Sequence, residues 1–483
     1  MEHGVNIDGE AVAFLNEIHE EADPIEDFQS ARGSDFSSVS SGVDHLEFLI
    51  HADQQLQNEI DGLPPLVSEP CIFKVNEGLR KGNEEAYTPV LVSIAPYHYE
   101  NSNLRAMREH KLRYFQSLSQ RINNYINDTI SVAAYLILVN EMADRAKACY
   151  ADPIRLERDE FVEMILLDAC FIIEFLRKSC YEELRDEDDP IFRSSWMQKQ
   201  ICRDLMLLEN QLPFFVLDEL FNPTLNLTFE KFPLHVLAIF PIFDMLPKCY
   251  SPEKTIDQII QKTSAHGREI KHFLDLLQIF YRPSFEEPSA NLSDGERCTR
   301  MSTAMELQEA GISFKVDDDN DDVSIFDISF KNGQMKIPKF QVADGTDTFL
   351  RNIIAYEQHS CDVGPKYFTD YMHFMDLLIN TEKDVNMLRL NEIIDNWLGD
   401  DVEVARLFNK LGDGVLISPS KFYYSDVCQK VKNHCENCWN RAKAKLRRNY
   451  FNNPWVGIST VAASILLLLT LIQTVVALIP PFS

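Results

Sequence analysis

Carboxylates on an apolar stretch are the residues of this chain best suited to acid–base chemistry. The stretch from Asp159 to Leu184 is hydrophobic nearly all round and carries Glu163, Asp168 and Glu174. Glu163 and Glu174 are 11 residues apart, which returns a helix to about the same face, so their carboxylates could share one cavity and have raised pKa values. The alternative is that each pairs with an Arg or Lys of a neighbouring helix, and this structural role is the favoured interpretation.

A second polar group precedes a proline. Glu209, Asn210 and Gln211 come just before Leu212 and Pro213. Proline lacks a backbone N–H and disfavours a helix before it, so one helix is expected to stop here and another to restart. Polar side chains at such a helix end commonly bind open backbone groups. A structural role is therefore expected for these three residues too.

The cysteines and acidic runs give weak signals for metals. The 11 cysteines are odd in number and irregularly spaced, which predicts reduced, mostly buried thiols rather than a disulfide framework. Cys435 and Cys438 have metal-ligand spacing, but no second ligand pair follows them, so packing or reversible acylation is favoured over zinc. The acidic run at 317–322 lacks the glycine and the closing glutamate of a calcium-binding hand, which predicts a solvated loop.

Several function classes are disfavoured by missing motifs and by charge. The chain contains no phosphate-binding glycine loop, dinucleotide fingerprint, nucleophile elbow, metalloprotease motif or kinase catalytic loop. We therefore expect no cofactor and lean against an enzyme. The formal net charge of −29 argues against nucleic acid as a partner, because phosphate binding needs clustered Lys and Arg.

The elements that would position these residues are mainly helices. Apolar residues at helical spacing predict a large helical domain over 71–449, and a small β element is expected between Ile312 and Pro338 around the turn Asn332-Gly333. Its expected strands are Ile312 to Val316, Val323 to Phe330 and Met335 to Pro338. Helices are expected within Leu104 to Tyr150, Asp159 to Leu184, Ile201 to Phe221, Ser251 to Tyr281, Phe349 to Cys361, Lys366 to Asn380, Asn391 to Leu398, Val402 to Leu411 and Lys421 to Tyr450.

Residues 1–70 form an acidic arm. They carry 16 acidic residues and one basic residue, Arg32, so they hold 15 of the 29 excess negative charges. Ser30 to Ser41 has the composition of a disorder-prone stretch, and Leu46, Leu49, Leu56 and Ile60 predict a short amphipathic helix. A solvated tail with one docked helix is favoured over a partner-binding segment.

Residues 450–483 are expected to form a membrane anchor and a short tail. Val456 to Ile479 contains no charged residue, and a helix of that length covers about 36 Å, more than the ~30 Å of a hydrocarbon core. One C-terminal transmembrane helix is therefore predicted, with a buried core helix as the alternative. The residues just before it are rich in positive charge: Arg441, Lys443, Lys445, Arg447 and Arg448.

Positive charge beside a span predicts that the body faces the cytosol, and the same cluster could meet anionic lipid. Which membrane holds the chain, plasma membrane or endomembrane, stays open. In the cytosol the glycosylation acceptors Asn127, Asn226 and Asn291 would stay unused.

An ordered series of motifs then resembles a known family. The motifs are Glu85-Ala-Tyr-Thr-Pro-Val-Leu-Val-Ser-Ile-Ala-Pro-Tyr-His, Glu109-His-Lys-Leu-Arg-Tyr, the Asp168-containing stretch, Leu207-Leu-Glu-Asn-Gln-Leu-Pro and Asn453-Pro-Trp. Together they resemble the plant-specific domain of unknown function 247 family, with Ala95 where the family usually has glycine. The resemblance implies a land-plant protein with a helical body and a C-terminal anchor, and it supplies no catalytic residues. Some grass members are implicated as pollen-side determinants of self-incompatibility.

The sequence therefore predicts a membrane-tethered recognition or signalling protein whose partner is another protein, and a self-incompatibility determinant if the source is a grass. One alternative is an enzyme of unrecognised type using the buried carboxylates Glu163 and Glu174. Another is a passive tether or a homo-oligomer formed through the span, where Ser459 and Ala463 give a weak small-residue pattern.

Overall fold

The computed structural model describes residues 51–52, 54–61, 70–126, 131–225, 232–245, 260–261, 269–283, 298–317, 324–360, 364–437 and 454–478. The chain divides into two compact units, Met1–Leu66 and Val67–Ser483. In the first unit, residues 51–52 and 54–61 are helical, in agreement with the expected short helix, and Leu56 and Ile60 are exposed. The rest of the acidic arm lies outside the described residues, apart from residue 70.

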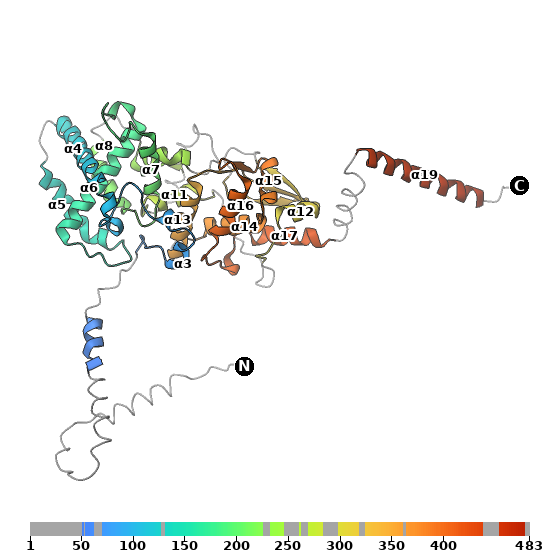
Figure 1. The fold of residues 1–483 in the computed structure, drawn as a ribbon, viewed down its shortest axis with the longest axis horizontal. Helices are drawn as coiled ribbons and strands as arrows, with labels where there is room; N and C mark the ends of the chain where they lie inside the picture. Colours follow the sequence, from blue (N-terminus) through green and yellow to red (C-terminus); the bar gives the residue numbers. More distant parts are fainter. Residues whose placement is uncertain are drawn as a thin grey trace, which may run out of the picture. The chain divides into compact units, whose positions relative to one another are not determined.

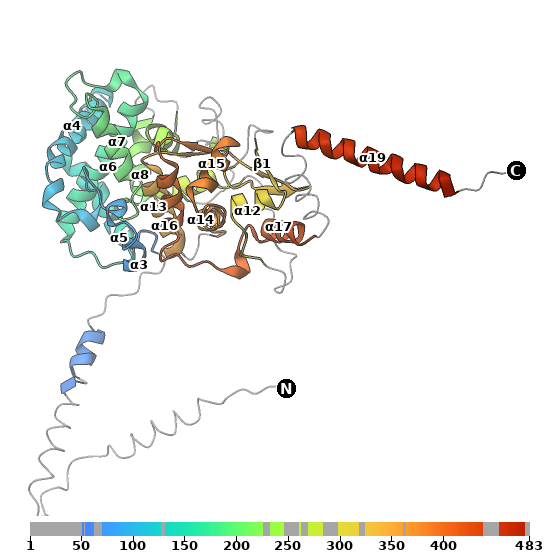
Figure 2. The same cartoon turned by 45° about the vertical axis from the view of Figure 1, so that its right-hand side comes forward.

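The second unit is mainly helical with small sheets, as predicted. In Figure 1, helices α4 to α8 gather on one side, helices α12, α14, α15 and α17 on the other, and α11 and α13 lie between them. Figure 2 shows the same two groups with α13 between them. The helices are α3 (Glu77–Arg80), α4 (Met107–Ile126), α5 (Val132–Lys147), α6 (Arg158–Cys180), α7 (Ser195–Leu205), α8 (Phe214–Leu225), α9 (Leu234–Ile239), α11 (Phe273–Tyr281), α12 (Ala304–Glu309), α13 (Thr346–His359), α14 (Tyr367–Leu378), α15 (Glu382–Leu390), α16 (Asp401–Leu411), α17 (Ser425–Glu436) and α19 (Pro454–Leu478). Short 3-10 helices cover Glu84–Tyr87, Pro96–His98, Ser102–Leu104, Glu182–Leu184, Phe240–Met245 and Pro419–Lys421.

Helix α6 is the centre of the first group of helices. It packs against α4, α5, α8 and α9, and nearly all its side chains from Phe161 to Lys178 are buried. A helix surrounded in this way must be apolar all round, which is the pattern that predicted it. The expected break at Pro213 is also confirmed, since α7 ends at Leu205 and α8 begins at Phe214.

Two small sheets complete the described body. Strands β1 (Ser313–Val316) and β2 (Ser329–Lys331) flank β3 (Gln334–Ile337), β1 in parallel and β2 antiparallel. The predicted turn is confirmed, because Asn332 and Gly333 have φ values of 53° and 77°. Strand β4 (Phe340–Val342) pairs in parallel with β5 (Ile394–Asn396) in the second sheet.

Two sequence expectations in this region are wrong. The helix expected over Asn391 to Leu398 contains β5, because β4 offers a partner edge and Glu392, at φ 61°, redirects the chain before it. The strand expected from Val323 is only Ser329–Lys331, because Ser324 donates its N–H to the Asp327 carboxylate at 2.7 Å and the chain turns there.

Helix α19 covers Pro454–Leu478 and contains no charged residue. Side chains within it are described at 458–459 and 461–474, and those residues are exposed. Across the described part of the chain, no helix is long and apolar enough to cross a membrane. The span predicted at Val456 to Ile479 stays a prediction, and the five basic residues at 441–448 lie outside the described residues.

Candidate functional site

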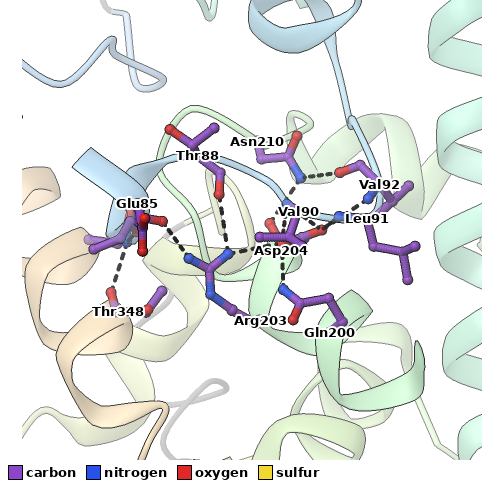
Figure 3. Close-up of polar contacts among 12 residues, drawn as sticks. Glu85, Thr88, Val90, Leu91, Val92, Gln200, Arg203, Asp204, Asn210 and Thr348 are labelled. Atoms are coloured by element: carbon purple, nitrogen blue, oxygen red, sulfur yellow. Dashed lines mark hydrogen bonds and ion pairs between the residues drawn. The ribbon is translucent and has the colours of Figure 1, made fainter. Parts of the chain in front are cut away.

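The motif segments other than Asn453-Pro-Trp meet at one stretch, residues 90–95, which lies outside any helix or strand. The carboxylate of Asp204, on α7, accepts hydrogen bonds from the backbone N–H groups of Val90, Leu91 and Val92, the last two at 2.7 and 2.9 Å (Figure 3). Gln200 and Arg203 donate to the same carboxylate at 3.2 and 3.1 Å. A buried backbone without a sheet partner needs such acceptors, so Asp204 substitutes for a neighbouring strand.

Asn210 continues this arrangement along the stretch. Its Oδ1 accepts from the N–H of Ile94 at 2.7 Å, and its Nδ2 donates to the carbonyl of Val92 at 3.1 Å and to that of Asp204 at 2.9 Å. Gln211 ties the same turn to α11 by accepting from the N–H of Leu274 at 3.2 Å. Both amide side chains are buried, so each hydrogen bond replaces one that water would supply.

Glu209 binds the first segment of the second unit. It accepts from the N–H of Val75 at 2.7 Å, forms an ion pair with Arg80 and lies 3.2 Å from His98 Nε2. Burial alone would raise the pKa of Glu209, but the hydrogen bonds from His98, Val75 and Arg80 outweigh burial and lower it. The structural role expected for Glu209, Asn210 and Gln211 is confirmed.

The end of the stretch has a strained backbone. Ala95 adopts φ 64° and ψ −174°, a region that glycine enters easily and other residues rarely. Its N–H donates to Asp168 Oδ2 at 2.8 Å, and Asp168 forms an ion pair with Lys111, which also donates to the carbonyl of Ser93 at 2.6 Å. We call Lys111, Asp168, Asp204 and Asn210 the backbone clamp. Such strain persists only where the surroundings fix the backbone.

A cavity of about 600 Å³ opens beside the clamp, with Ser93, Lys111 and Asp168 among its lining residues. The Ser93 hydroxyl is buried, with no hydrogen-bond partner among the described residues. Burial raises the pKa of Asp168 and the charge of Lys111 opposes that rise. Lys111 already donates to two acceptors, so it is a poor base for Ser93, and the cavity floor is suited to holding a polar group rather than to activating a nucleophile.

The structure places the predicted carboxylates in separate ion pairs. Glu163 is half exposed and pairs with Arg108 at 2.5 Å, whereas Glu174 is fully buried and pairs with Arg121 at 2.7 Å and Arg177 at 3.3 Å. The shared cavity considered for Glu163 and Glu174 is therefore not found, and the alternative of separate ion pairs holds. The two carboxylates do not meet because α4 brings a different arginine to each of them, Arg108 to Glu163 and Arg121 to Glu174.

The metal candidates are only partly described. Cys435 is half-buried, while Cys438 and residues 318–322 of the acidic run lie outside the described residues. The glycosylation acceptors Asn127, Asn226 and Asn291 lie outside them too. Among described residues, no group of three or more His, Cys, Asp or Glu side chains could hold a metal ion. The eight described cysteines are free thiols and five of them are buried: Cys71, Cys170, Cys202, Cys298 and Cys428.

A second cavity, which the sequence did not predict, lies beside an exposed tryptophan. This Trp397 pocket measures about 650 Å³ and combines apolar side chains such as Phe175 and Trp397 with polar ones such as Lys199 and Asp344. The Trp397 side chain is 66% exposed, although its backbone N–H is fixed on the carbonyl of Val342 at 2.9 Å. The remaining lining residues are Ser179, Ser195, Gln198, Cys202, Pro241, Gln341, Ala343 and Gly345.

Two further exposed aromatic residues are sequence neighbours of residues that line the Trp397 pocket. Trp196 is 60% exposed and follows Ser195 of the lining, and Phe240 is 40% exposed and precedes Pro241. The structure describes the side chains of two tryptophans, Trp196 and Trp397, and both are exposed. The sequence signal that could have found this site is a tryptophan in a polar setting, as in Asp395-Asn-Trp397, where burial is not expected.

Comparisons with known proteins give one family. The chain matches the family described as DUF247, a plant protein of unknown function, over residues 72–469. The UPF0481 protein At3g47200 of Arabidopsis thaliana is 30% identical over 432 residues, covering 85% of this chain and 86% of that protein. The putative UPF0481 protein At3g02645 of the same plant is 22% identical over 528 residues, covering 91% and 96%. No solved structure matches the chain.

Proposed function

The chain belongs to the DUF247 family of plant proteins, and from this premise we propose that it is a membrane-anchored recognition protein that acts by binding another protein at the Trp397 pocket. The observation that carries the proposal is the exposed tryptophan beside a cavity, with its backbone N–H bound to the carbonyl of Val342. Tryptophan is the residue type most enriched among the side chains that dominate protein–protein binding. A pollen-side role in self-incompatibility is a narrower form of this proposal and applies to a chain from a grass.

The make-up of the Trp397 pocket suits a protein partner. Its apolar residues would receive an apolar or aromatic side chain of the partner, while Lys199 and Asp344 offer one charge of each sign for polar contacts. An apolar centre with a polar surround is the common anatomy of protein interfaces. Because the backbone of Trp397 is already fixed by Val342, little of its main-chain freedom is lost on binding.

The anchor part of the proposal is supported by helix α19. Large apolar side chains are exposed along its described residues: Ile458, Val461, Ile465, Leu466, Leu467, Leu468, Leu469, Leu471 and Ile472. In water this exposure is unfavourable by about 25 cal/mol per Å² of apolar surface, and a hydrocarbon environment removes the cost. The basic residues before the helix support a cytosolic body, and on that side they can also contact anionic lipid.

The partner proposal is tested by quantitative pulldown of the full chain from plant membranes. We expect Trp397→Ala to reduce recovery of specific partners by at least about tenfold, the effect of losing one dominant interface residue. The matched control is Leu416→Ala, which removes an 81% exposed apolar side chain that does not line the Trp397 pocket. Equal partner recovery by wild type and Trp397→Ala would refute the proposed site.

The anchor and its orientation are tested separately. The full chain is expected to resist alkaline extraction from membranes, and a chain ending at residue 453 is expected to be released. Protease added outside intact vesicles should digest the body, and no glycan should be found at Asn127, Asn226 or Asn291. Exchanging the span for an unrelated apolar helix should preserve partner recovery, whereas loss of recovery would favour a homo-oligomer formed through the span.

A further inference from the structure

Two cysteines far apart in the sequence lie side by side where the second unit begins. The N–H groups of Cys71 and Ile72 both donate to the carbonyl of Cys149 at 2.9 Å, and Ile72 pairs with Tyr150 as in a parallel β-ladder. Neighbouring backbones in such a ladder are about 4.8 Å apart. That spacing lies within the ~4.4–6.8 Å between Cα atoms that a disulfide requires. The backbone therefore needs no large movement to allow one.

The two thiols also contact each other. The Cys71 thiol donates a hydrogen bond to Cys149 Sγ, which lowers the pKa of Cys149, and the charges of Arg145 and Lys271 lower it further against the opposing effect of burial. The same hydrogen bond, with burial, raises the pKa of Cys71. Cys149 is partly exposed and Cys71 is buried. Cys149 is thus the thiol suited to attack an oxidant, and Cys71 the one suited to resolve the product.

We propose that Cys71 and Cys149 form an oxidation site that a hydroperoxide converts into a disulfide. The Cys149 thiolate attacks one peroxide oxygen, the O–O bond breaks, and a sulfenic acid forms on Cys149 as an alcohol or water leaves. Cys71 Sγ then attacks Cys149 Sγ, the S–O bond breaks and water leaves with the Cys71 proton. In balance, two thiols and one hydroperoxide give one disulfide, one alcohol and one water.

Two other buried cysteines, Cys170 and Cys202, lack this arrangement. Burial raises the pKa of Cys202 to about 12, and burial also raises the pKa of Cys170. Thiols of that kind react slowly, so peroxide is expected to oxidise the Cys71–Cys149 pair before Cys170 and Cys202. The bond would tie the chain just after the start of the second unit to Cys149, two residues after the end of α5, and would close a loop that contains α4 and α5. Closing a loop of that size restricts the unfolded chain and stabilises the fold.

The test treats the full chain, in membranes, with hydrogen peroxide and maps its peptides without reduction. We expect one linked pair, the Cys71 peptide joined to the Cys149 peptide with the loss of two hydrogen atoms, and a higher unfolding temperature that a reductant reverses. Cys71→Ser should stop at the sulfenic acid, so dimedone should label Cys149. Cys149→Ser should leave Cys71 unlabelled. Cys202→Ser, the matched control, should form the bond as the wild type does.

Circular dichroism of each reduced variant shows whether it is folded before oxidation. If Cys71→Ser is unfolded, Cys71→Ala replaces it in the dimedone experiment. The proposal is overturned if folded wild-type chain yields unlinked Cys71 and Cys149 peptides after peroxide, or if dimedone labels Cys170 and Cys202 as readily as Cys149. These outcomes do not depend on the partner or on the Trp397 pocket.

Discussion

Two regions of the second unit depart from the usual rule that polar side chains are exposed and large apolar side chains are buried. The backbone clamp buries charged and amide groups, and the Trp397 pocket exposes large apolar ones. In the clamp, every contact needed to offset burial comes from the chain itself, as when Asp204 accepts from three successive N–H groups. At the pocket, Trp397 keeps 66% of its surface exposed. Internal contacts therefore explain the first region, whereas for the second we propose a protein partner.

Buried polar clusters and exposed aromatic side chains therefore differ as evidence for function. A buried polar cluster resembles an active site in sequence, yet here its groups satisfy one another and fix the chain. An exposed aromatic group has no such internal explanation, because solvent contact costs free energy that folding alone does not recover. We therefore expect substitutions in the clamp to change stability strongly and substitutions at the Trp397 pocket to change it little. For partner binding we expect the opposite, with large effects at the pocket and small ones in the clamp.

Among the substitutions of polar residues, the largest loss of stability is expected for Asp204→Ala. The substitution leaves the N–H groups of Val90, Leu91 and Val92 without their acceptor, and we expect it to lower the free energy of unfolding by about 3–5 kcal/mol. Urea unfolding of the full chain in detergent measures this effect. Glu109→Gln, which removes an exposed carboxylate paired with Arg113, is the control and should change stability by less than about 1 kcal/mol. A similar small loss for both variants would show that the clamp is not needed for folding.

A second test uses the two carboxylates of helix α6. Glu174→Gln leaves the buried Arg177 and the partly buried Arg121 without their counter-ion, so a loss of about 3 kcal/mol is expected. Glu163→Gln breaks only a half-exposed pair and should cost no more than about 1 kcal/mol. The two variants share a helix and a chemistry, so each is the control of the other. Equal losses would mean that burial does not set the energies of these pairs.

The sequence predicted helix α6 and the helix break at Pro213 better than it predicted which side chains meet at a site. The apolar surface of α6 and the break at Pro213 follow from local rules, and the structure confirms both. The separation of Glu163 from Glu174 depends on which arginines α4 brings to each, and helical spacing within α6 does not contain that information. The same limit applies to β5, whose strand conformation depends on β4 more than fifty residues earlier.

The sequence indicated the backbone-binding role of one residue of the backbone clamp, Asn210, together with that of its neighbours Glu209 and Gln211. Glu209, Asn210 and Gln211 were expected to bind backbone groups because they precede Pro213, and they do. Their targets, Val75, Ile94 and Leu274, were not predictable, since they come from segments that local patterns do not connect. The Trp397 pocket was missed for the same reason, because its lining comes from α6, α7, the 3-10 helix Phe240–Met245, β4 with the three residues after it, and the residue after β5.

A smaller effect, and a gain, is expected for Ala95→Gly. Glycine adopts φ 64° without strain, so relief of about 1–3 kcal/mol is partly offset by the extra freedom of glycine in the unfolded chain, leaving a gain of about 1 kcal/mol. A higher midpoint in urea unfolding would show it. The control is Ala169→Gly in the middle of α6, which should lose about 1 kcal/mol. A loss for Ala95→Gly would mean that the clamp holds its backbone without strain.

The smallest effect on stability is expected for Trp397→Ala, the same variant that should remove partner binding. Most of its side chain faces solvent, so truncation gives up little buried surface, and the free energy of unfolding should change by no more than about 0.5 kcal/mol. Phe340→Ala in the neighbouring strand β4, where the side chain is fully buried, should cost about 3–5 kcal/mol and serves as the contrast. If Trp397→Ala were instead as costly as Phe340→Ala, the tryptophan would be part of the fold, and its loss of binding would no longer identify a recognition surface.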